Sequence, residues 1–155
     1  MNKFLIYAPR ANPSKGTVQA IVVDMDHTVC HANHRNVYDF DKADTDVPDS
    51  MTLELIKAYL NNYPHIKLLI LTAREDVGNS RKATSTWLLA NGLNPDDLFM
   101  RPLKDHRHSN EVKKEIMEKH ILPNYNVRMV FEDSKRCADT YKEMGLKVIM
   151  PEISA

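Results

Sequence analysis

Two carboxylates follow a short apolar run near the start of the chain, where a buried strand has no need of acids. The run, residues 20–23 (AIVV), is rich in β-branched residues, and Asp24, Asp26 and Thr28 come after it at alternate positions. Two carboxylates this close repel each other unless a cation or a shared proton relieves them. The pair is therefore a candidate for metal binding or acid–base chemistry, the alternative being an acidic turn after a strand.

Two other apolar runs also end in polar side chains. These are Thr72 and Arg74, at and after the end of residues 67–72 (KLLILT), and Glu132 and Asp133, after residues 127–131 (VRMVF). The carboxyl ends of parallel strands share one edge of a sheet, and ligands bind at that edge in open α/β folds. We therefore expect these side chains to meet the first two carboxylates at one site.

The collected groups are suited to the transfer of a phosphoryl group. Hard oxygen ligands at this density favour Mg²⁺, which uses few carboxylates and keeps several waters. With Mg²⁺ bound, a carboxylate can attack phosphorus and form an aspartyl-phosphate. Asp26, held off the metal, can protonate the leaving alkoxide and then activate water. Thr72 and Lys113 can hold the transferring oxygens, where negative charge must be stabilised.

Strands and helices must alternate to bring these groups together, and the spacing of apolar residues predicts that they do. Strands are expected near residues 18–24, 67–72, 98–100, 127–131 and 146–150, with 3–8 as a candidate edge strand. Helices are expected near 50–60, 80–90, 109–116 and 134–144, with caps at Asp49 or Ser50, at Ser109 and at Ser134. The pattern predicts a three-layer, Rossmann-like α/β fold, with a mainly parallel five-stranded sheet and helices on both faces.

Residues 29–48 show no clear period, and we expect them to form a flap beside the site, the alternative being a solvated loop. Their acidic run lacks the central glycine and closing glutamate of a calcium loop. His27, His31 and His34 have no set of cysteines to complete a zinc site, so we expect surface or flap histidines. About twenty residues are too few for a full capping domain, which predicts an open site that admits a polymer end.

Composition limits the class of protein. The chain has 155 residues, enough for one domain, and its 21 Lys and Arg residues balance its 21 Asp and Glu residues. There is no global basic field for nucleic acid, so any such binding must use a local patch. Two cysteines make no disulfide framework, and no stretch approaches the ~18 apolar residues of a membrane span. We expect a single cytoplasmic domain over residues 1–155, with no membrane and no obligatory protein partner.

At four places in order, the chain resembles phosphatases of the haloacid dehalogenase (HAD) superfamily. Asp24, Asp26 and Thr28 match the motif D-x-D-x-T. The other three motifs are a strand ending in Thr or Ser, a helix-borne lysine and a strand ending in acids. They are matched by Thr72, by Lys113 with Lys114 as the alternative, and by Glu132 with Asp133. The resemblance implies a HAD-like fold with a minimal cap and a Mg²⁺-dependent phosphatase.

A narrower resemblance is to the phosphatase domain of phage polynucleotide kinase-phosphatases. It covers residues 38–47 (YDFDKADTDV), 71–75 (LTARE) and 105–116, followed by Lys119 and His120. That family removes 3′-phosphates from nucleic acid ends and nucleotides, so the resemblance implies end repair of DNA or RNA. The family's kinase half has no counterpart here, because the phosphate-binding motif G-x-x-x-x-G-K-[ST] is absent, and we expect no kinase domain.

The resemblance also implies roles for individual residues. Asp24 would be the nucleophile, Asp26 the general acid/base, and Thr72 and Lys113 the other catalytic groups. Metal ligands would be Asp24, Asp26 through its backbone carbonyl, Asp133 and Glu132, and substrate would be bound by Arg35, Arg74, Arg107 and Thr28. The chain departs from the family at three positions: His27 replaces a glycine, Ser109 replaces an acid, and Glu132 replaces an aspartate.

Three functions follow from these observations. The first is a phosphatase that removes 3′-phosphates from polynucleotides or nucleotides. The second is a small-molecule phosphatase that acts on nucleoside monophosphates or sugar phosphates. The third is a catalytically idle Mg²⁺-binding adaptor module, against which the complete set of acids and Thr72 argues. The substrate class is therefore a phosphorylated nucleic acid end or nucleotide, and the cofactor is Mg²⁺.

Overall fold

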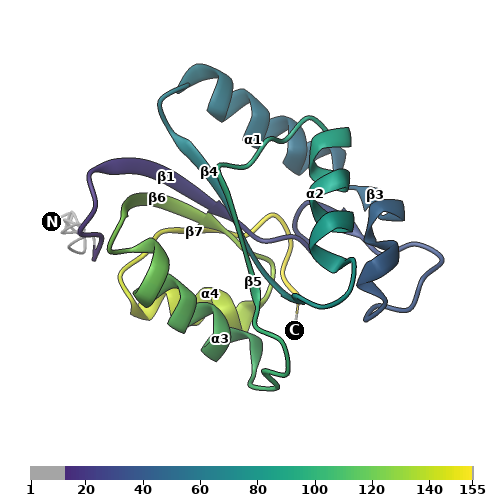
Figure 1. Cartoon of the computed structure of the whole chain (residues 1–155). Helices are drawn as coiled ribbons and strands as arrows, with labels where there is room; N and C mark the ends of the chain where they lie inside the picture. Colours follow the sequence, from purple (N-terminus) through teal and green to yellow (C-terminus); the bar gives the residue numbers. More distant parts are fainter. Residues whose placement is uncertain (1–12, 155) are drawn as a thin grey trace, which may run out of the picture.

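A parallel sheet of five strands lies at the centre of the computed structural model, which describes residues 13–154 (Figure 1). The strands are β1 (Val18–Val23), β4 (Lys67–Glu75), β5 (Asp97–Arg101), β6 (Tyr125–Phe131) and β7 (Val148–Ile149). They pair in the order β5–β4–β1–β6–β7. This confirms the predicted sheet, whereas the candidate edge strand at residues 3–8 lies outside the described residues.

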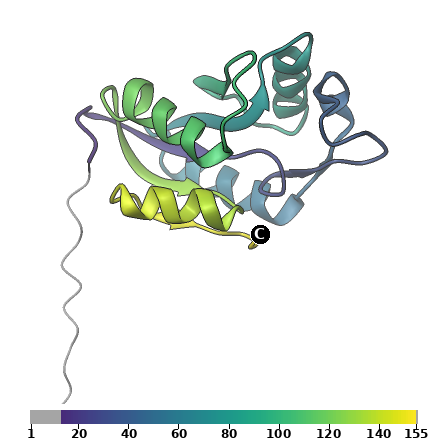
Figure 2. The ribbon, with the colours of Figure 1, turned by 90° about the horizontal axis from the view of Figure 1, so that it is seen from below.

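Two pairs of helices cover opposite faces of the sheet (Figures 1 and 2). One pair is α1 (Ser50–Asn62) and α2 (Ser80–Ala90); the other is α3 (Ser109–Ile116), continued by the π-turn η2 (Met117–Ile121), and α4 (Lys135–Glu143). Ile21 and Val23 of β1 pack in one apolar core, and Ala20 and Val22 pack in the other. Because both faces of β1 are covered there, residues 20–23 are apolar without alternation, as the predicted three-layer fold requires.

The direction in which the chain winds changes at β1. Strands β4 and β5 lie on one side of it, and β6 and β7 lie on the other. In open α/β sheets, ligands bind at the carboxyl ends of the strands beside such a switch point. The residues after β1 and β6 therefore occupy the place where the fold favours a site.

Strand β4 is longer than predicted, since it continues through Arg74 to Glu75. The ladder with β5 shifts register between Leu71 and Glu75, and the Asp76 N–H then donates to the Arg101 carbonyl at 2.9 Å. Pairing with β5 thus stabilises three residues, two of them charged, that sequence periodicity does not mark as a strand. As a consequence, Thr72 lies inside the strand and not at its tip.

The expected flap contains regular structure and is attached to the core. It includes a short antiparallel pair, β2 (Cys30–His31) with β3 (Val47–Pro48), and a 3₁₀ helix, η1 (Phe40–Thr45). Figure 2 shows this segment beside α2, and the buried Trp87 of α2 donates from its indole nitrogen to the Asp46 carbonyl at 2.8 Å. The segment is therefore held in place by α2.

Three helix caps were predicted, and two of them are confirmed. Ser134 caps α4, since its hydroxyl accepts from the Cys137 N–H at 3.4 Å. Asp49 caps α1, as expected, since its carboxylate accepts from the Thr52 N–H at 3.1 Å. The prediction of Ser109 as a cap was wrong, because Ser109 is the first residue of α3 and His108 is the cap. The Ser109 hydroxyl instead accepts from Arg101 Nη2 at 3.2 Å.

No helix among residues 13–154 is long and apolar enough to cross a membrane.

The cap at Asp49 gives a first testable prediction. Burial alone would raise the pKa of this carboxyl, but contacts with His31 and Thr52 outweigh it, and the pKa lies below its ordinary value of 3.8. Asp49→Ala should lower the free energy of unfolding by about 1 kcal/mol. The difference from wild type is fully present above the ordinary pKa and is lost as pH falls through the lower folded value. Urea unfolding at several pH values measures it, with the exposed Asp44→Ala as control; an equal loss in both variants would refute the cap.

Candidate active site

Three buried carboxylates and one buried lysine meet at the carboxyl edge of the sheet. Asp24 follows β1, Glu132 and Asp133 follow β6, and carboxylate oxygens of the three lie within 4.8 Å of one another. Lys113, from α3, donates from Nζ to Asp24 Oδ1 and to Glu132 Oε2, at 2.7 Å each. The alternative lysine, Lys114, is on the outer face of α3 with 51% of its side chain exposed. The fold thus brings four predicted site residues into one cluster.

Thr28 links two members of this cluster. Its hydroxyl oxygen lies 3.0 Å from Asp24 Oδ2 and 3.1 Å from Asp133 Oδ1, and the residue is completely buried. A hydroxyl has one hydrogen, so it donates to one carboxylate at a time. We expected Thr28 to bind substrate, but the structure uses its hydroxyl to hold Asp24 beside Asp133.

The charges of the cluster are not balanced by the protein. Burial and the neighbouring Glu132 raise the pKa of Asp24 well above 3.8, although Lys113 opposes them. Burial would also raise the pKa of Asp133, yet hydrogen bonds from partners that include Ser154 and Thr28 keep it below 3.8. One lysine therefore faces three buried carboxylates, a shortage of positive charge that a bound cation would remove.

The donor set of this cluster fits Mg²⁺. All candidate ligand atoms are carboxylate oxygens, which are the hard ligands that Mg²⁺ prefers. Both oxygens of Glu132 already have protein partners, since Oε2 accepts from Lys113 and Oε1 accepts from the Ser134 N–H at 3.1 Å. The same holds for Asp24, whose Oδ1 accepts from Lys113 at 2.7 Å and whose Oδ2 lies 3.0 Å from the Thr28 hydroxyl, so all three carboxylates are candidate ligands.

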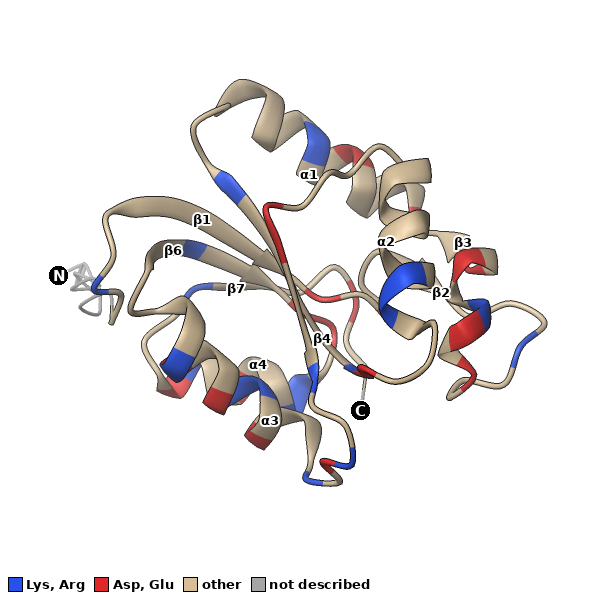
Figure 3. Ribbon diagram, viewed as in Figure 1, with Lys and Arg blue, Asp and Glu red and all other residues tan. Residues whose placement is uncertain are grey.

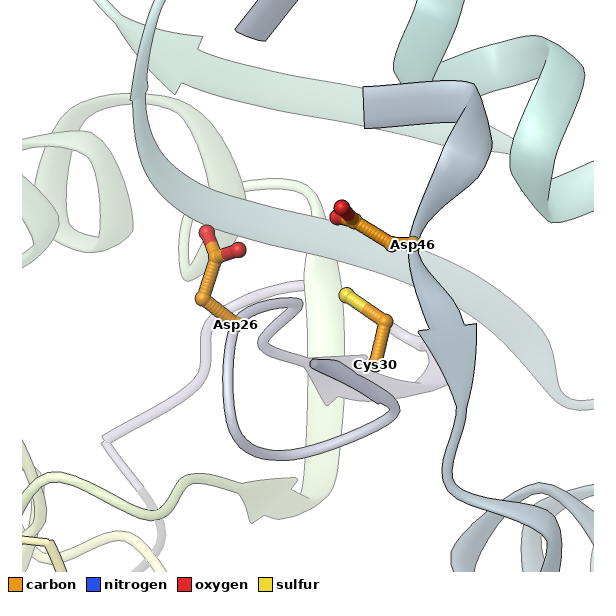
Figure 4. A group of neighbouring side chains, drawn as sticks. All are labelled: Asp26, Cys30 and Asp46. Carbon is orange, nitrogen blue, oxygen red and sulfur yellow. The ribbon is translucent and has the colours of Figure 1, made fainter. Parts of the chain in front are cut away.

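A second cluster surrounds the guanidinium of Arg74. The side chains of Asp26, Cys30 and Asp46 point toward a common space (Figure 4), and they are close enough to share a metal ion. Arg74 fills that space: its Nη2 lies 2.8 Å from Asp26 Oδ1, 2.8 Å from Asp46 Oδ2 and 3.3 Å from Cys30 Sγ. Its Nε also donates to Asp26 Oδ2 at 3.0 Å. A guanidinium therefore supplies the positive charge here, and it fixes both oxygens of Asp26.

Arg35 lies on the other side of Asp46 and has most of its donors occupied. Its Nε and Nη2 donate to Asp46 at 2.6 and 2.9 Å, and its Nη1 donates to two carbonyls of the flap. The Phe40 ring lies 5.6 Å from the guanidinium carbons of both Arg35 and Arg74. Arg35, expected to bind substrate, thus ties the flap to the second cluster.

Two further predicted site residues lie outside both clusters. Thr72 is completely buried in β4, and its hydroxyl oxygen accepts from the Arg74 N–H at 3.3 Å. Arg107 is partly exposed on the loop between β5 and α3, where charges of both signs gather (Figure 3). Its guanidinium donates to Asp105 and to Glu115.

A cleft of about 410 Å³ opens above Asp26 and Arg74. Residues of the flap and of the loop between β5 and α3 are among those that line it. His27, which also lines the cleft, has φ of 63°, a left-handed conformation that favours glycine. Its N–H donates to the Cys30 carbonyl at 2.8 Å, which closes the turn after Asp26. This backbone geometry explains why a glycine is the ordinary residue at that position.

Sequence reasoning did not single out Asp46. The side chain is completely buried and bridges Arg35 and Arg74, with oxygen–nitrogen distances of 2.6 to 2.9 Å. In the sequence it is one of several aspartates of the flap, and no period distinguishes it. The available signal was indirect: two arginines expected at a buried site need a buried acid between them.

The chain is similar to known proteins over nearly its whole length. Residues 18–151 match the family model of the polynucleotide kinase PNKP phosphatase domain. Among solved structures, a chain of the Pnkp1/Rnl/Hen1 RNA repair complex superposes with a TM-score of 0.82 and 24% identity over 99% of this chain. A chain of a second Pnkp1/Rnl/Hen1 structure gives 0.82 and 25% over 91%. In both cases the match spans 48% of the solved chain, about half of its length.

Proposed function

This chain belongs to the family of polynucleotide kinase PNKP phosphatase domains and is a phosphatase, and from that premise we propose that it removes 3′-phosphates from nucleic acid ends. The observation that carries the proposal is the contact of Lys113 with Asp24 at 2.7 Å, beside Asp133 and next to an open cleft. These contacts support a nucleophile with its counter-charge and a metal-ligating acid, close along the chain to Asp26 at the cleft.

We propose that Asp24 is the nucleophile. Its carboxylate attacks phosphorus, the bond from phosphorus to the leaving 3′-oxygen breaks, and an aspartyl-phosphate forms. Mg²⁺, held by Asp24 and Asp133 when bound, would neutralise charge on the carboxylates and on the phosphate. Lys113 holds Asp24 and stabilises the transferring oxygens.

Asp26 serves as general acid and then as general base. It protonates the leaving 3′-oxygen and afterwards takes a proton from the water that attacks the aspartyl-phosphate, which releases phosphate and restores Asp24. With 35% of its side chain exposed at the cleft, Asp26 is accessible to substrate. Arg74 contacts both oxygens of Asp26 and thereby sets its orientation.

One observation favours a second candidate, a phosphatase of nucleoside monophosphates. The chain carries no net charge, so binding of a long polymer would depend on a few cations, chiefly Arg101 at the end of β5 and Lys104 and Arg107 on the loop that follows. A mononucleotide needs no such patch. One of the solved structures is of an RNA repair complex, so an RNA end is tested as a substrate beside a DNA end.

A phosphate-release panel distinguishes the two candidates. We expect the highest kcat/KM with 3′-phosphorylated DNA or RNA oligonucleotides, lower values with a 3′-nucleotide, and very low values with a 5′-nucleotide or a sugar phosphate. Removal of divalent metal with EDTA should abolish release, and Mg²⁺ should restore it. Preference for the 5′-nucleotide would overturn the proposed substrate, and full activity in EDTA would overturn the role of the metal.

A further inference from the structure

The cleft beside Asp26 has more room than a phosphate group needs. Its volume of about 410 Å³ lies within the range of about 300–1,000 Å³ that is typical of sites for small organic molecules. Asp26 and Arg74 line it, and Asp26 is two residues from Asp24 of the acidic cluster, so a substrate whose phosphate reaches Asp24 would have the rest of its structure near this space. The cleft is therefore placed to contact the group that carries the phosphate.

The residues that line the cleft include two sets that differ in chemistry. The flap contributes Val37, Tyr38 and Phe40, and the segment from β5 to α3 contributes Arg101, His106 and Arg107 together with Asp105, to which Arg107 donates. An apolar, aromatic set of groups and a charged set that includes two arginines match a nucleotide, which has a flat apolar base and a negatively charged backbone. A sugar phosphate has no flat apolar face to use the first set.

Tyr38 is the group of the flap whose ring is available. The residue is 82% exposed, the highest value for a large hydrophobic residue within residues 13–154. The neighbouring Val37 is also exposed, at 55%. Phe40, in contrast, already contacts the guanidinium groups of Arg35 and Arg74. The ring of Tyr38 therefore offers a face at the mouth of the cleft on which a planar group can stack.

We propose that this cleft is a binding site for the terminal nucleobase of the substrate, stacked on Tyr38. The proposal rests on the proposed function, because it concerns the base attached to the sugar with the 3′-phosphate. Stacking on Tyr38 requires that one face of the base be uncovered, so the site favours an unpaired 3′-terminal nucleotide over one within a blunt duplex. Stacking is tolerant of sequence, because every base has a flat π-face.

Binding tests the proposal without requiring turnover. The inactive Asp24→Asn variant, with and without Tyr38→Ala, is titrated with a fluorescent single-stranded oligonucleotide that ends in a 3′-phosphate. We expect Tyr38→Ala to raise Kd about tenfold, and Tyr38→Phe to retain affinity, because phenylalanine keeps the ring. A matched oligonucleotide whose terminal sugar lacks a base should lose much less affinity from the same substitution.

Kinetics with the active enzyme separates stacking from structural damage. Tyr38→Ala should raise KM about tenfold for the base-bearing 3′-phosphate end, with kcat little changed. The control is Tyr63→Ala, which removes another partly exposed tyrosine at the far end of α1 and should not change KM. Thermal unfolding shows whether each variant is folded.

The outcomes separate this inference from the proposed function. If wild-type enzyme releases 3′-phosphate but Tyr38→Ala affects base-bearing and abasic ends equally, the stacking site is wrong and the function stands. Unchanged Kd and KM in Tyr38→Ala would also overturn it, as would failure of Asp24→Asn to bind the oligonucleotide. If wild-type enzyme instead prefers 5′-nucleotides, the proposed substrate fails, and a base-dependent loss of affinity in Tyr38→Ala still supports the stacking site.

Discussion

Asp24→Asn should lower the rate of phosphate release by about 10⁴-fold or more, because an amide cannot form the aspartyl-phosphate. Asparagine has nearly the same shape as aspartate, so the packing around the site is preserved. Single-turnover release from a 3′-phosphorylated oligonucleotide measures the loss. The control is Asp139→Asn, on the outer face of α4, which should retain near wild-type activity.

The same variant should remain folded and lose no stability. Burial and the nearby Glu132 raise the pKa of Asp24, which shows that its charge is unfavourable in this place. Removing that charge relieves repulsion, while Lys113 keeps Glu132 as a partner at 2.7 Å. The thermal midpoint should therefore equal or exceed that of wild type without metal. Residual activity above about 1% in a folded variant would refute Asp24 as the nucleophile.

Lys113→Met should destabilise the metal-free protein by about 3–5 kcal/mol, because it removes the cation that faces three buried carboxylates. The methionine keeps an unbranched side chain of similar length, so loss of charge and not loss of volume dominates. Activity should also be lost, since Lys113 holds Asp24 and is expected to stabilise the transferring oxygens. Denaturant unfolding in EDTA measures the change in stability.

Added Mg²⁺ should restore part of the stability lost in Lys113→Met. The variant retains all three carboxylates, so it can still bind the cation. A cation that binds only the folded state stabilises it, and the gain grows with the logarithm of the ratio of cation concentration to Kd. The matched control is Lys114→Met, one residue further along α3. The Lys114 side chain is exposed, and its ammonium makes one long contact of 3.9 Å, with Glu118. We expect a change below about 0.5 kcal/mol there. Equal destabilisation by the two variants would mean that Lys113 is not the counter-charge of the site.

The order of elements could be predicted from the sequence because it depends on local patterns. Apolar runs such as residues 20–23 and 127–131 form buried strands, and caps such as Asp49 and Ser134 lie where helices begin. The extent of β4 could not be predicted in this way, because residues up to Glu75 are strand only through pairing with β5. The cap of α3 was misplaced by one residue for a similar reason, since Ser109 is used by Arg101.

The sequence by itself determined the acidic cluster. Each of its carboxylates directly follows a buried strand, and parallel strands bring their carboxyl ends to one edge, so Asp24 and Asp133 had to be neighbours. The same alternation of strands and helices packs α3, which carries Lys113, against one face of the sheet. These placements can be predicted from the spacing of apolar residues and from the right-handedness of the crossover connections.

Only the tertiary structure decided the second cluster. Asp46 is one aspartate among several in the flap, and it becomes the buried partner of Arg35 and Arg74 only because Trp87 and α2 hold that segment against the sheet. Which of several like charges is buried depends on packing between distant segments, and each buried charge requires a partner at close distance. A local sequence pattern does not indicate such distances. The contacts by which Arg74 orients Asp26 could therefore be found only in the folded structure.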